Sequence, residues 1–422
     1  MKKIALAIIT TMTVSAMSSA ADIDYKFAQP YGNWWVAPSQ PTLDLTAINK
    51  SADKTNCTVT LTINTDFGQP VYDLSQTADI AAGDSCAMSF KFNLEPGFYK
   101  CVFTDGATTL AQYNIGYEPE RIYSPADYQP DIVEFWQRAR ADLDSIAPEF
   151  AMERFPEQDT EKSQAYKVTM KSVGNEQLTA FLMLPKKKGK YPAIINYMGY
   201  GAGPAYCDFL PSYDGEFIYF QQNIRGQGLN LATNTHGEWM AENIDDIENY
   251  YYRNAFMDAV RGVDFVFTLP QFDGVNIFAE GGSQGGGLTL AATALDKRIV
   301  AAAPFIPFLN DFPDYFKLND WIGGTYHRAA AEKGLTEAQL LRNVSYFDIK
   351  NLAMMIDVPV LMAVGLQDPT GPPHTNFAGY NLIKSPKQFI IYPNMGHAVP
   401  RPDWDHAHIN FFKSHMKPTS KK

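Results

Sequence analysis

The stretch Gly281-Gly282-Ser283-Gln284-Gly285 directly follows the apolar run 275–279 and precedes the small-residue segment 286–292. A strand that ends in G-x-S-x-G and continues into a helix is typical of a nucleophile elbow, a turn so tight that only glycines fit around the serine. The motif also occurs by chance in glycine-rich turns, so its meaning depends on its surroundings. Here the strand before it and the helix after it favour an elbow, with Ser283 held above the edge of a sheet.

Two further reactive side chains follow Ser283, each just beyond an apolar run. The run 358–364 predicts a buried strand that ends shortly before Asp368, and the run 388–392 precedes His397. An aspartate or a histidine in a turn is common by itself. Alpha/beta hydrolases, however, supply their triad in the order serine, acid, histidine, on loops after strands of a mostly parallel sheet. The order found here, ahead of one terminal helix expected at 407–416, predicts such a triad.

A glycine-rich loop, Gly199-Tyr200-Gly201-Ala202-Gly203, follows the apolar run 193–195. Such a loop could be a plain turn between a strand and a helix. In alpha/beta hydrolases, backbone N–H groups of a loop in this place face the oxyanion that develops during acyl transfer. The loop is therefore the candidate partner of the elbow.

A wider set of motifs surrounds these residues. They are Arg225-Gly226-Gln227, the elbow continued to Gly286, Gly365-Leu366-Gln367-Asp368 with Pro372-Pro373, Phe377-Ala378-Gly379-Tyr380-Asn381, Gly396-His397, Tyr250-Tyr251-Tyr252-Arg253, Asp258-Ala259-Val260-Arg261 and Ser345-Tyr346-Phe347-Asp348. As a set, they resemble the acetyl xylan esterase and cephalosporin C deacetylase family, carbohydrate esterase family seven. The resemblance covers roughly residues 125 to 416.

The resemblance implies an alpha/beta-hydrolase fold and a serine esterase that removes acetyl groups from acetylated carbohydrate, such as xylan or xylooligosaccharides. It implies that Ser283 is the nucleophile, Asp368 the acid and His397 the base. The oxyanion hole would consist of the backbone N–H groups of Tyr200 and Gln284. Neither a metal nor an organic cofactor is expected.

Arg225 and Gln227 are assigned a structural role, in which they shape the loop below the site. The chain departs from the family pattern at Met198, where members usually have histidine, and at Ala398, where glutamate usually follows the triad histidine. Members of the family tend to form hexamers, so the resemblance also implies a homo-oligomer. An added N-terminal domain could block or replace those contacts.

The first residues predict export. A basic start at 1–3, an apolar segment at 4–14 and small residues at 18–20 form a secretory signal peptide, cut after Ala20 or Ala21. No cysteine stands at the cut, which argues against a bacterial lipid anchor, and no other stretch is long enough to span a bilayer. We expect the protein to be periplasmic or secreted, with no membrane partner.

Composition limits the remaining classes. The chain has 422 residues and a formal net charge of −11, so a large core is expected and a nucleic-acid partner has no basic surface to bind. None of its cysteines has C-x-x-C spacing, which argues against a zinc site. Three of the four cysteines lie in the N-terminal part, where they allow at most one disulfide, and the sequence does not choose the pair. The cysteines are Cys57, Cys86, Cys101 and Cys207.

The chain reads as two parts of unlike character. Short alternating segments between residues 42 and 117 predict an antiparallel, immunoglobulin-like β-sandwich; the clearest are 42–47, 57–63, 87–92 and 99–103. Helical periodicity begins at 132–143. The predicted divisions are a signal peptide at 1–21, the β-sandwich domain at 22–121 and an alpha/beta-hydrolase domain at 122–422.

Residues 311–345 interrupt the alternation of strands and helices and are a candidate cap over the site. Four aromatic residues there could line a sugar pocket or could simply pack; they are Tyr315, Phe316, Trp321 and Tyr326.

The sequence leaves two alternative functions open. One is another hydrolase on the same fold, such as a peptidase of the prolyl oligopeptidase kind. The other is a carbohydrate-binding protein with a vestigial hydrolase domain, which the N-terminal part with Trp34-Trp35 would support. The sequence does not show which acetylated glycan would be the natural substrate.

Overall fold

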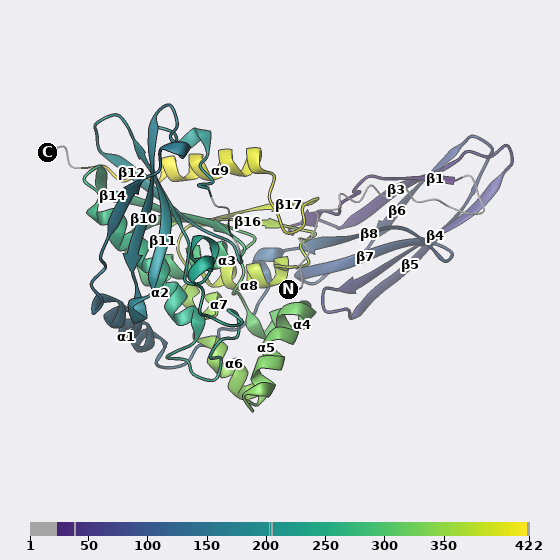
Figure 1. Cartoon of the computed structure of the whole chain (residues 1–422). Helices are drawn as coiled ribbons and strands as arrows, with labels where there is room; N and C mark the ends of the chain where they lie inside the picture. Colours follow the sequence, from purple (N-terminus) through teal and green to yellow (C-terminus); the bar gives the residue numbers. More distant parts are fainter. Residues whose placement is uncertain (1–22, 38, 202, 204–205, 420–422) are drawn as a thin grey trace. The chain divides into compact units, whose positions relative to one another are not determined.

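The chain divides into two compact units, one ending at Glu118 and the other beginning at Pro119. The predicted signal peptide lies outside the residues that the structure describes. Within the described residues, no helix is both long enough and apolar enough to cross a membrane. The residues described by the computed structural model (Figure 1) are 23–37, 39–201, 203 and 206–419.

The first unit consists of two sheets. The five-stranded sheet has the order β2-β8-β7-β4-β5, and the three-stranded sheet has the order β1-β3-β6. Along β3 the side chains alternate between buried and partly exposed, because one face of the strand lies against a core. The strands are β1 (Ile23–Phe27), β2 (Trp34–Trp35), β3 (Thr42–Asn49), β4 (Thr55–Thr65), β5 (Pro70–Ile80), β6 (Ser85–Lys91), β7 (Gly97–Asp105) and β8 (Thr108–Tyr117).

One core joins the two sheets of the first unit. Leu45 of β3 and Phe90 of β6 share a buried cluster with Leu61 of β4 and Phe103 of β7. The rings of Phe90 and Phe103 meet edge to face, with centroids 5.7 Å apart. Pairing within the sheets is antiparallel as predicted, except that β2 pairs with β8 in parallel. All four cysteines of the chain are free thiols.

The second unit is built on a nine-stranded sheet with the order β17-β16-β15-β14-β12-β13-β11-β10-β9. The neighbouring strands in the part of the sheet ordered β13-β12-β14-β15-β16-β17 are all parallel. The remaining neighbours pair antiparallel: β11 with β13, β10 with β11, and β9 with β10. The predicted strands at 193–195, 358–364 and 388–392 are β12, β16 and β17. The strands are β9 (Ala151–Arg154), β10 (Ser163–Lys171), β11 (Gln177–Pro185), β12 (Tyr191–Tyr197), β13 (Ile218–Gln222), β14 (Phe272–Gly282), β15 (Ile299–Phe305), β16 (Val360–Gly365) and β17 (Lys387–Tyr392).

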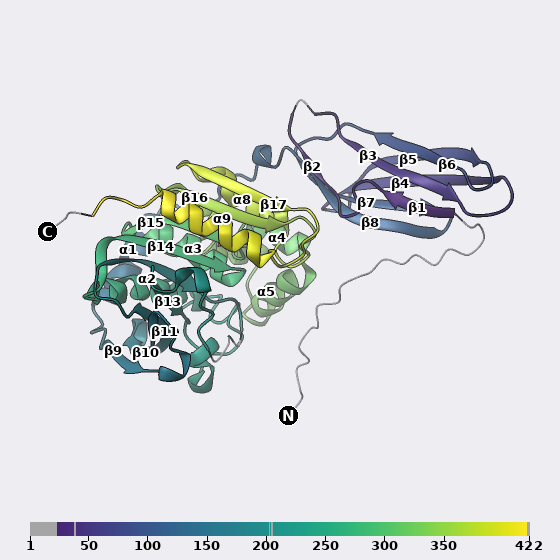
Figure 2. The same cartoon turned by 90° about the horizontal axis from the view of Figure 1, so that it is seen from above.

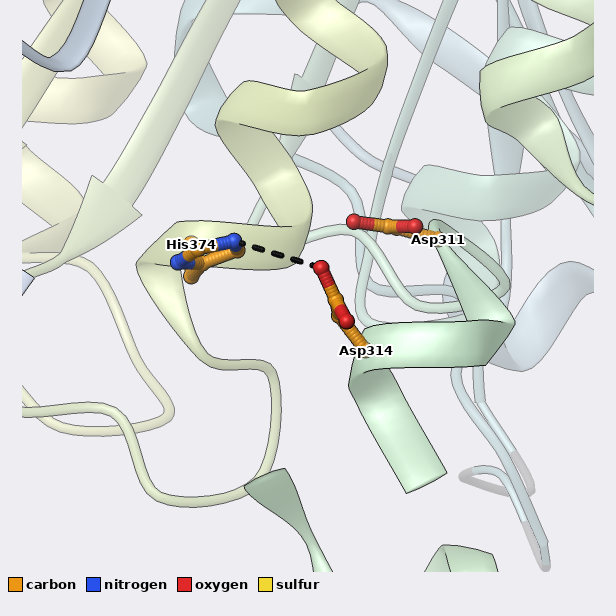
Figure 3. A group of neighbouring side chains, drawn as sticks. All are labelled: Asp311, Asp314 and His374. Carbon is orange, nitrogen blue, oxygen red and sulfur yellow. Dashed lines mark ion pairs between the residues drawn. The ribbon is translucent and has the colours of Figure 1, made fainter. Parts of the chain in front are cut away.

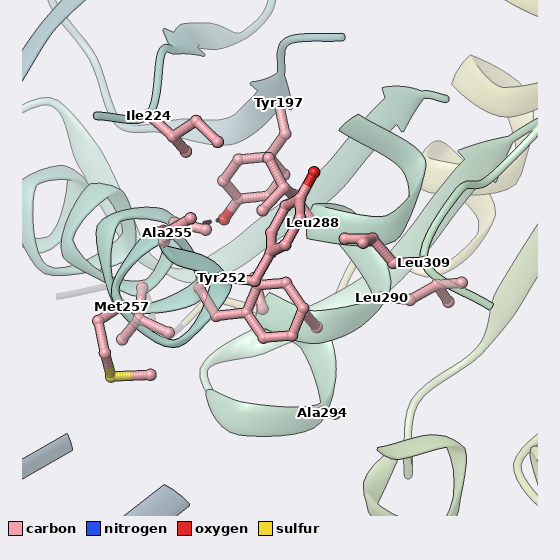
Figure 4. Close-up of a cluster of buried hydrophobic side chains, with 14 of the residues drawn as sticks. Tyr197, Ile224, Tyr252, Ala255, Met257, Leu288, Leu290, Ala294 and Leu309 are labelled. Atoms are coloured by element: carbon pink, nitrogen blue, oxygen red, sulfur yellow. Dashed lines mark hydrogen bonds between the residues drawn. The ribbon is translucent and has the colours of Figure 1, made fainter. Parts of the chain in front are cut away.

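Helices cover both faces of this sheet (Figure 2). Consecutive strand residues point to opposite faces, so Ile195 of β12 packs into the core with α2 and α3, while Ile194 packs into the core with α9. Figure 4 shows part of the core between the nine-stranded sheet and helices α2 and α3, with Tyr197, Tyr252 and Leu288 among its members. The helices are α1 (Ile132–Asp144), α2 (Tyr251–Thr268), α3 (Gln284–Leu295), α4 (Phe312–Leu318), α5 (Asp320–Glu332), α6 (Glu337–Ser345), α7 (Ile349–Leu352), α8 (Pro373–Leu382) and α9 (Arg401–Ser414).

The terminal helix begins earlier than the sequence predicts. The sequence predicts a terminal helix over 407–416, but α9 begins at Arg401 and ends at Ser414. Pro402 lies in its first turn, where the missing N–H of proline costs no helical hydrogen bond. The prediction therefore missed a turn that the apolar residues alone do not mark.

Helices α4, α5 and α6 occupy the predicted insert at 311–345. Of the four aromatic side chains that were predicted to line a pocket or to pack, those of Tyr315, Phe316 and Tyr326 are buried. The fourth, Trp321, is 56% exposed. Packing thus accounts for three of these aromatics but not for Trp321.

Candidate active site

The elbow lies at the junction of β14 and α3. Ser283 has φ 57° and ψ −122°, a conformation that a non-glycine residue adopts only when its surroundings enforce it. The flanking glycines explain how the turn closes. A Cβ on Gly281 would lie 2.6 Å from the carbonyl oxygen of Gly285, and a Cβ on Gly285 would lie 2.0 Å from the carbonyl oxygen of Tyr197. Only glycine therefore fits at positions 281 and 285, two residues before and two residues after the serine.

The predicted acid and base meet the serine in one hydrogen-bonded chain. His397 Nε2 lies 2.8 Å from the Oγ of Ser283, and His397 Nδ1 lies 2.8 Å from the Oδ2 of Asp368. The three residues come from three loops, which follow β14, β16 and β17 at the carboxyl end of the parallel strands. The Asp368 side chain is fully buried, while that of His397 is 26% exposed and can meet a substrate.

The loop after β16 holds Asp368 in place. The Oδ1 atom of Asp368 accepts hydrogen bonds from the backbone N–H groups of Thr370 at 2.8 Å and Gly371 at 2.9 Å. Its other oxygen is left for His397. The carboxylate is thus fixed from one side and orients the imidazole on the other.

The glycine-rich loop after β12 packs against the elbow. A Cβ on Gly285 would also approach the carbonyl carbon of Met198 to 3.2 Å, and a Cβ on Gly199 would lie 3.8 Å from the carbonyl oxygen of Gly282. Gln284 is the first residue of α3, so its N–H has no acceptor within the helix. Tyr200 and Gln284, the predicted oxyanion-hole residues, therefore lie on two segments in contact beside Ser283.

Gln227 joins those two segments through its side chain. Its Oε1 accepts a hydrogen bond from the Gly201 N–H at 2.8 Å, and its amide exchanges reciprocal hydrogen bonds with that of Gln284, both 3.1 Å long. Its Nε2 also donates to the Tyr251 hydroxyl at 2.9 Å. The Gln284 Oε1 atom accepts in addition from Tyr252 at 2.9 Å. Gln227 therefore links the glycine-rich loop to the start of α3.

Arg225 anchors the same segment to α2. Its guanidinium lies 2.7 Å from Oδ1 and 2.9 Å from Oδ2 of Asp258, and its backbone N–H donates to the same carboxylate at 3.0 Å. Burial by itself would lower the pKa of Arg225, but the charge and hydrogen bonds of Asp258 hold that pKa above its usual value. Gly226, between Arg225 and Gln227, has φ +68°, and a Cβ there would lie 2.3 Å from Asn234. The sequence did not reveal Asp258 as the partner.

A buried ion pair lies directly before the elbow in β14. Glu280 Oε2 is 2.9 Å from Nε2 of His408 in α9, and it accepts a hydrogen bond from the Tyr213 hydroxyl at 2.9 Å. His408 Nδ1 lies 2.8 Å from the Trp404 carbonyl oxygen, so both ring nitrogens face acceptors. Burial would raise the pKa of Glu280, but His408 outweighs it and holds that pKa below its usual value.

Aromatic rings gather around Tyr200. The Tyr200 ring meets that of Trp239 edge to face with centroids 5.3 Å apart, and that of Trp321 at 6.4 Å and 80°. The Tyr200 hydroxyl donates to Glu238 Oε1 at 3.1 Å. Burial and the Glu238 carboxylate raise the pKa of Tyr200, so its hydroxyl stays protonated at neutral pH.

One group of side chains has the composition of a metal site. Asp311, Asp314 and His374 each offer a ligand atom, and these atoms lie within 4.8 Å of one another (Figure 3). Both carboxylates already face lysines: Lys350 Nζ is 2.8 Å from Asp311, and Lys317 Nζ is 2.8 Å from Asp314. We therefore assign the group a structural role, linking α4 to the start of α8. The group was not predicted from the sequence, because His374 lies 60 positions after Asp314.

The chain is similar to several known proteins. Residues 111–416 match the family described as acetyl xylan esterase (AXE1). The acetyl esterase Axe7A of Xylanibacter ruminicola is 26% identical over 311 residues, which cover 71% of this chain and 70% of that protein. The solved structure of acetyl xylan esterase 1 from Thermoanaerobacterium sp. JW/SL YS485 is 29% identical with a TM-score of 0.64, covering 71% of this chain and 98% of its own. That of the acetyl xylan esterase from Paenibacillus sp. R4 is 27% identical with a TM-score of 0.66, covering 71% and 99%.

Proposed function

The chain belongs to the acetyl xylan esterase family, and from that premise we propose that it removes acetyl groups from acetylated xylan or xylooligosaccharides. Membership makes it a carboxylic ester hydrolase with an alpha/beta-hydrolase fold. The observation that carries the proposal is the hydrogen-bonded chain from Ser283 through His397 to Asp368.

In the proposed first step, Ser283 attacks the carbonyl carbon of the acetyl ester while His397 Nε2 takes the hydroxyl proton. Asp368 holds the imidazole in the tautomer that carries the other proton on Nδ1, and it stabilises the imidazolium that forms. The negative charge on the carbonyl oxygen would be held by the backbone N–H groups of Tyr200 and Gln284. Loss of one such donor typically costs about 3 kcal/mol of transition-state stabilisation.

Collapse of this intermediate breaks the bond to the sugar oxygen, which leaves as an alcohol with the proton from His397. An acetyl group then remains on Ser283 as an ester. In the second step, His397 takes a proton from water, whose oxygen attacks the acetyl carbon. The bond from that carbon to Ser283 Oγ then breaks, His397 returns the proton to the serine oxygen, and acetate is released. These steps call on protein side chains and water, with no part for a metal or an organic cofactor.

We further propose a domain organisation, a location and an oligomeric state for the protein. The first unit is an immunoglobulin-like β-sandwich domain, which its two sheets around one core support. The second unit is the catalytic domain, with residues 311–345 as a cap. The signal peptide at 1–21 would export the protein to the periplasm or the medium. A homo-oligomer is proposed on family resemblance alone.

The test is acetate release from a panel of acetylated glycans by the wild type and by Ser283→Ala. The wild type should release acetate from acetylated xylooligosaccharides, and Ser283→Ala should reduce kcat by about 10⁴-fold or more. A matched control is Ser145→Ala, on the surface after α1. Acetate release by Ser283→Ala at the wild-type rate would refute the proposed nucleophile. Cleavage of proline-containing peptides, with acetylated glycans left intact, would favour a peptidase.

A further inference from the structure

Trp321 is a large aromatic side chain that faces solvent at the rim of the site. It is 56% exposed, whereas the other aromatic residues of the insert are buried; they are Phe312, Tyr315, Phe316 and Tyr326. Its ring lies 6.4 Å from that of Tyr200, centroid to centroid. Because Tyr200 belongs to the loop that packs on the elbow, Trp321 borders the place where the ester would react.

The backbone that carries Trp321 is tied to the loop of the triad acid. Asn319 caps α5, and its side-chain amide donates to the carbonyl oxygens of Pro369 at 3.0 Å and Thr370 at 3.2 Å. These two residues directly follow Asp368. Trp321 lies in the first turn of that helix, so it is held in a fixed relation to the acid loop on one side and to Tyr200 on the other.

The helix surface beside Trp321 is bare. Residues three apart on a helix are neighbours, and the residue three positions on is Gly324. This glycine is exposed, and a Cβ built on it would meet nothing within 4 Å. Thr325, the neighbour four positions on, is buried. The indole is therefore left open to a partner from solution.

We propose that Trp321 is a stacking platform for a pyranose ring of the acetylated substrate, an inference that rests on the proposed function. One face of a pyranose is lined by C–H groups, and covering it with an indole removes apolar surface of both partners from water. The indole loses little conformational freedom on binding, because only two side-chain torsions position this rigid ring. Trp321 thus recognises the sugar that carries the ester, while the elbow and the oxyanion loop act on the acetyl group.

The experiment compares two substrates that share the acetyl ester but differ in the alcohol. One is acetylated xylotriose and the other is methyl acetate, whose alcohol has no ring that could stack. Trp321→Ala should lower kcat/KM for acetylated xylotriose about tenfold, mainly by raising KM. Its kcat/KM for methyl acetate should stay within twofold of the wild type, and Trp321→Phe should recover part of the loss. Tyr123→Ala, which removes another exposed aromatic of the same unit, should leave both substrates unaffected.

Binding without turnover gives a second readout. Titration of Ser283→Ala with acetylated xylotriose by calorimetry should show an affinity about tenfold higher than that of the Ser283→Ala/Trp321→Ala double variant. Equal losses on both substrates, or equal affinities in the titration, would overturn the role of Trp321 and leave the proposed function standing. A wild type that hydrolyses methyl acetate but no acetylated pyranoside would refute both.

A subunit interface is the competing use of an exposed tryptophan. Light scattering coupled to size exclusion should therefore give the same mass for the wild type and Trp321→Ala. A smaller assembly, with activity on both substrates reduced alike, would show that Trp321 binds another copy of the chain and not a sugar.

Discussion

The side-chain amides of Gln227 and Gln284 donate hydrogen bonds to each other, both 3.1 Å long. Gln284 begins the helix of the elbow, and Gln227 also accepts the N–H of Gly201 in the opposing loop at 2.8 Å. One buried side chain therefore sets the separation between the two segments that would bind the oxyanion. Arg225, two residues earlier, fixes Gln227 to α2 through Asp258.

Replacing Gln227 should impair turnover more than substrate binding. Gln227→Ala removes the link between the two segments, and misplacement of catalytic donors by about 1 Å can cost about 100-fold. We expect kcat for an acetyl ester to fall 10- to 100-fold with KM changed less than threefold. Gln164→Ala, outside the site, is the control. A rise in KM alone would contradict this positioning role.

The elbow should not tolerate a methyl group at Gly285. A Cβ there would lie 2.0 Å from the Tyr197 carbonyl oxygen, and overpacking of this kind costs about 1–3 kcal/mol. Gly324→Ala provides the comparison, since its Cβ would meet nothing within 4 Å in helix α5. That change should raise the free energy of unfolding by up to about 1 kcal/mol. Urea unfolding of both variants measures the difference, and equal effects would be inconsistent with the packing described.

The Glu280–His408 pair should show strong energetic coupling. Removal of one partner leaves the other buried without its counter-charge, which typically costs about 3–5 kcal/mol. Glu280→Gln and His408→Gln should each lower the free energy of unfolding by about this amount, and the double variant by clearly less than their sum. Denaturant unfolding of the wild type, the two single variants and the double variant completes this double-mutant cycle. Additive losses would show that the two side chains do not interact.

The Glu280–His408 pair should also make the stability of the folded protein depend on pH. The pKa of Glu280 in the folded protein lies below 4.5, its ordinary value, because His408 outweighs the effect of burial. The unfolded chain therefore binds the proton first, and the stability from Glu280 is present above pH 4.5 and lost as the pH falls below it. The difference in stability between the wild type and Glu280→Gln should narrow on acidification. A difference that grows would contradict the assignment.

Asp314 should stabilise the protein through its charge. The hydrogen bond from His374, then that from Lys317, lowers the pKa of Asp314 to about 2 against an ordinary value of 3.8. Its contribution is therefore present above pH 3.8 and lost as the pH falls through 2. At pH 7, Asp314→Asn should lower the free energy of unfolding by about 1 kcal/mol, allowing for partial exposure. Thermal unfolding across pH measures this, with Glu161→Gln as the exposed control.

Local constraints made the residues of the candidate site predictable from the sequence. Gly281 and Gly285 mark the elbow because even a methyl side chain does not fit at either position. Asp368 and His397 follow apolar runs that end at one edge of the sheet. The contacts that support them were not predictable. Asp258 reaches Arg225 across 33 positions and His408 reaches Glu280 across more than a hundred, and neither residue type signals its partner.

Burial in the insert also could not be deduced. Four aromatics between 315 and 326 read alike in the sequence, and only the packing of α4, α5 and α6 separates the exposed Trp321 from the buried three. In the first unit, period-two alternation predicted β3 and β4. It did not predict the parallel pairing of β2 with β8, which depends on two strands that are remote in sequence.

In the proposed mechanism, Ser283 carries the acetyl group between the two steps. Rapid quenching of the wild type during turnover of an acetylated xylooligosaccharide, followed by peptide mass analysis, tests it directly. We predict a mass increase of one acetyl group on the peptide that contains Ser283, which disappears once the substrate is exhausted. Two results together would refute this mechanism: steady acetate release while the peptide never becomes acetylated, and acetate release by Ser283→Ala at the wild-type rate.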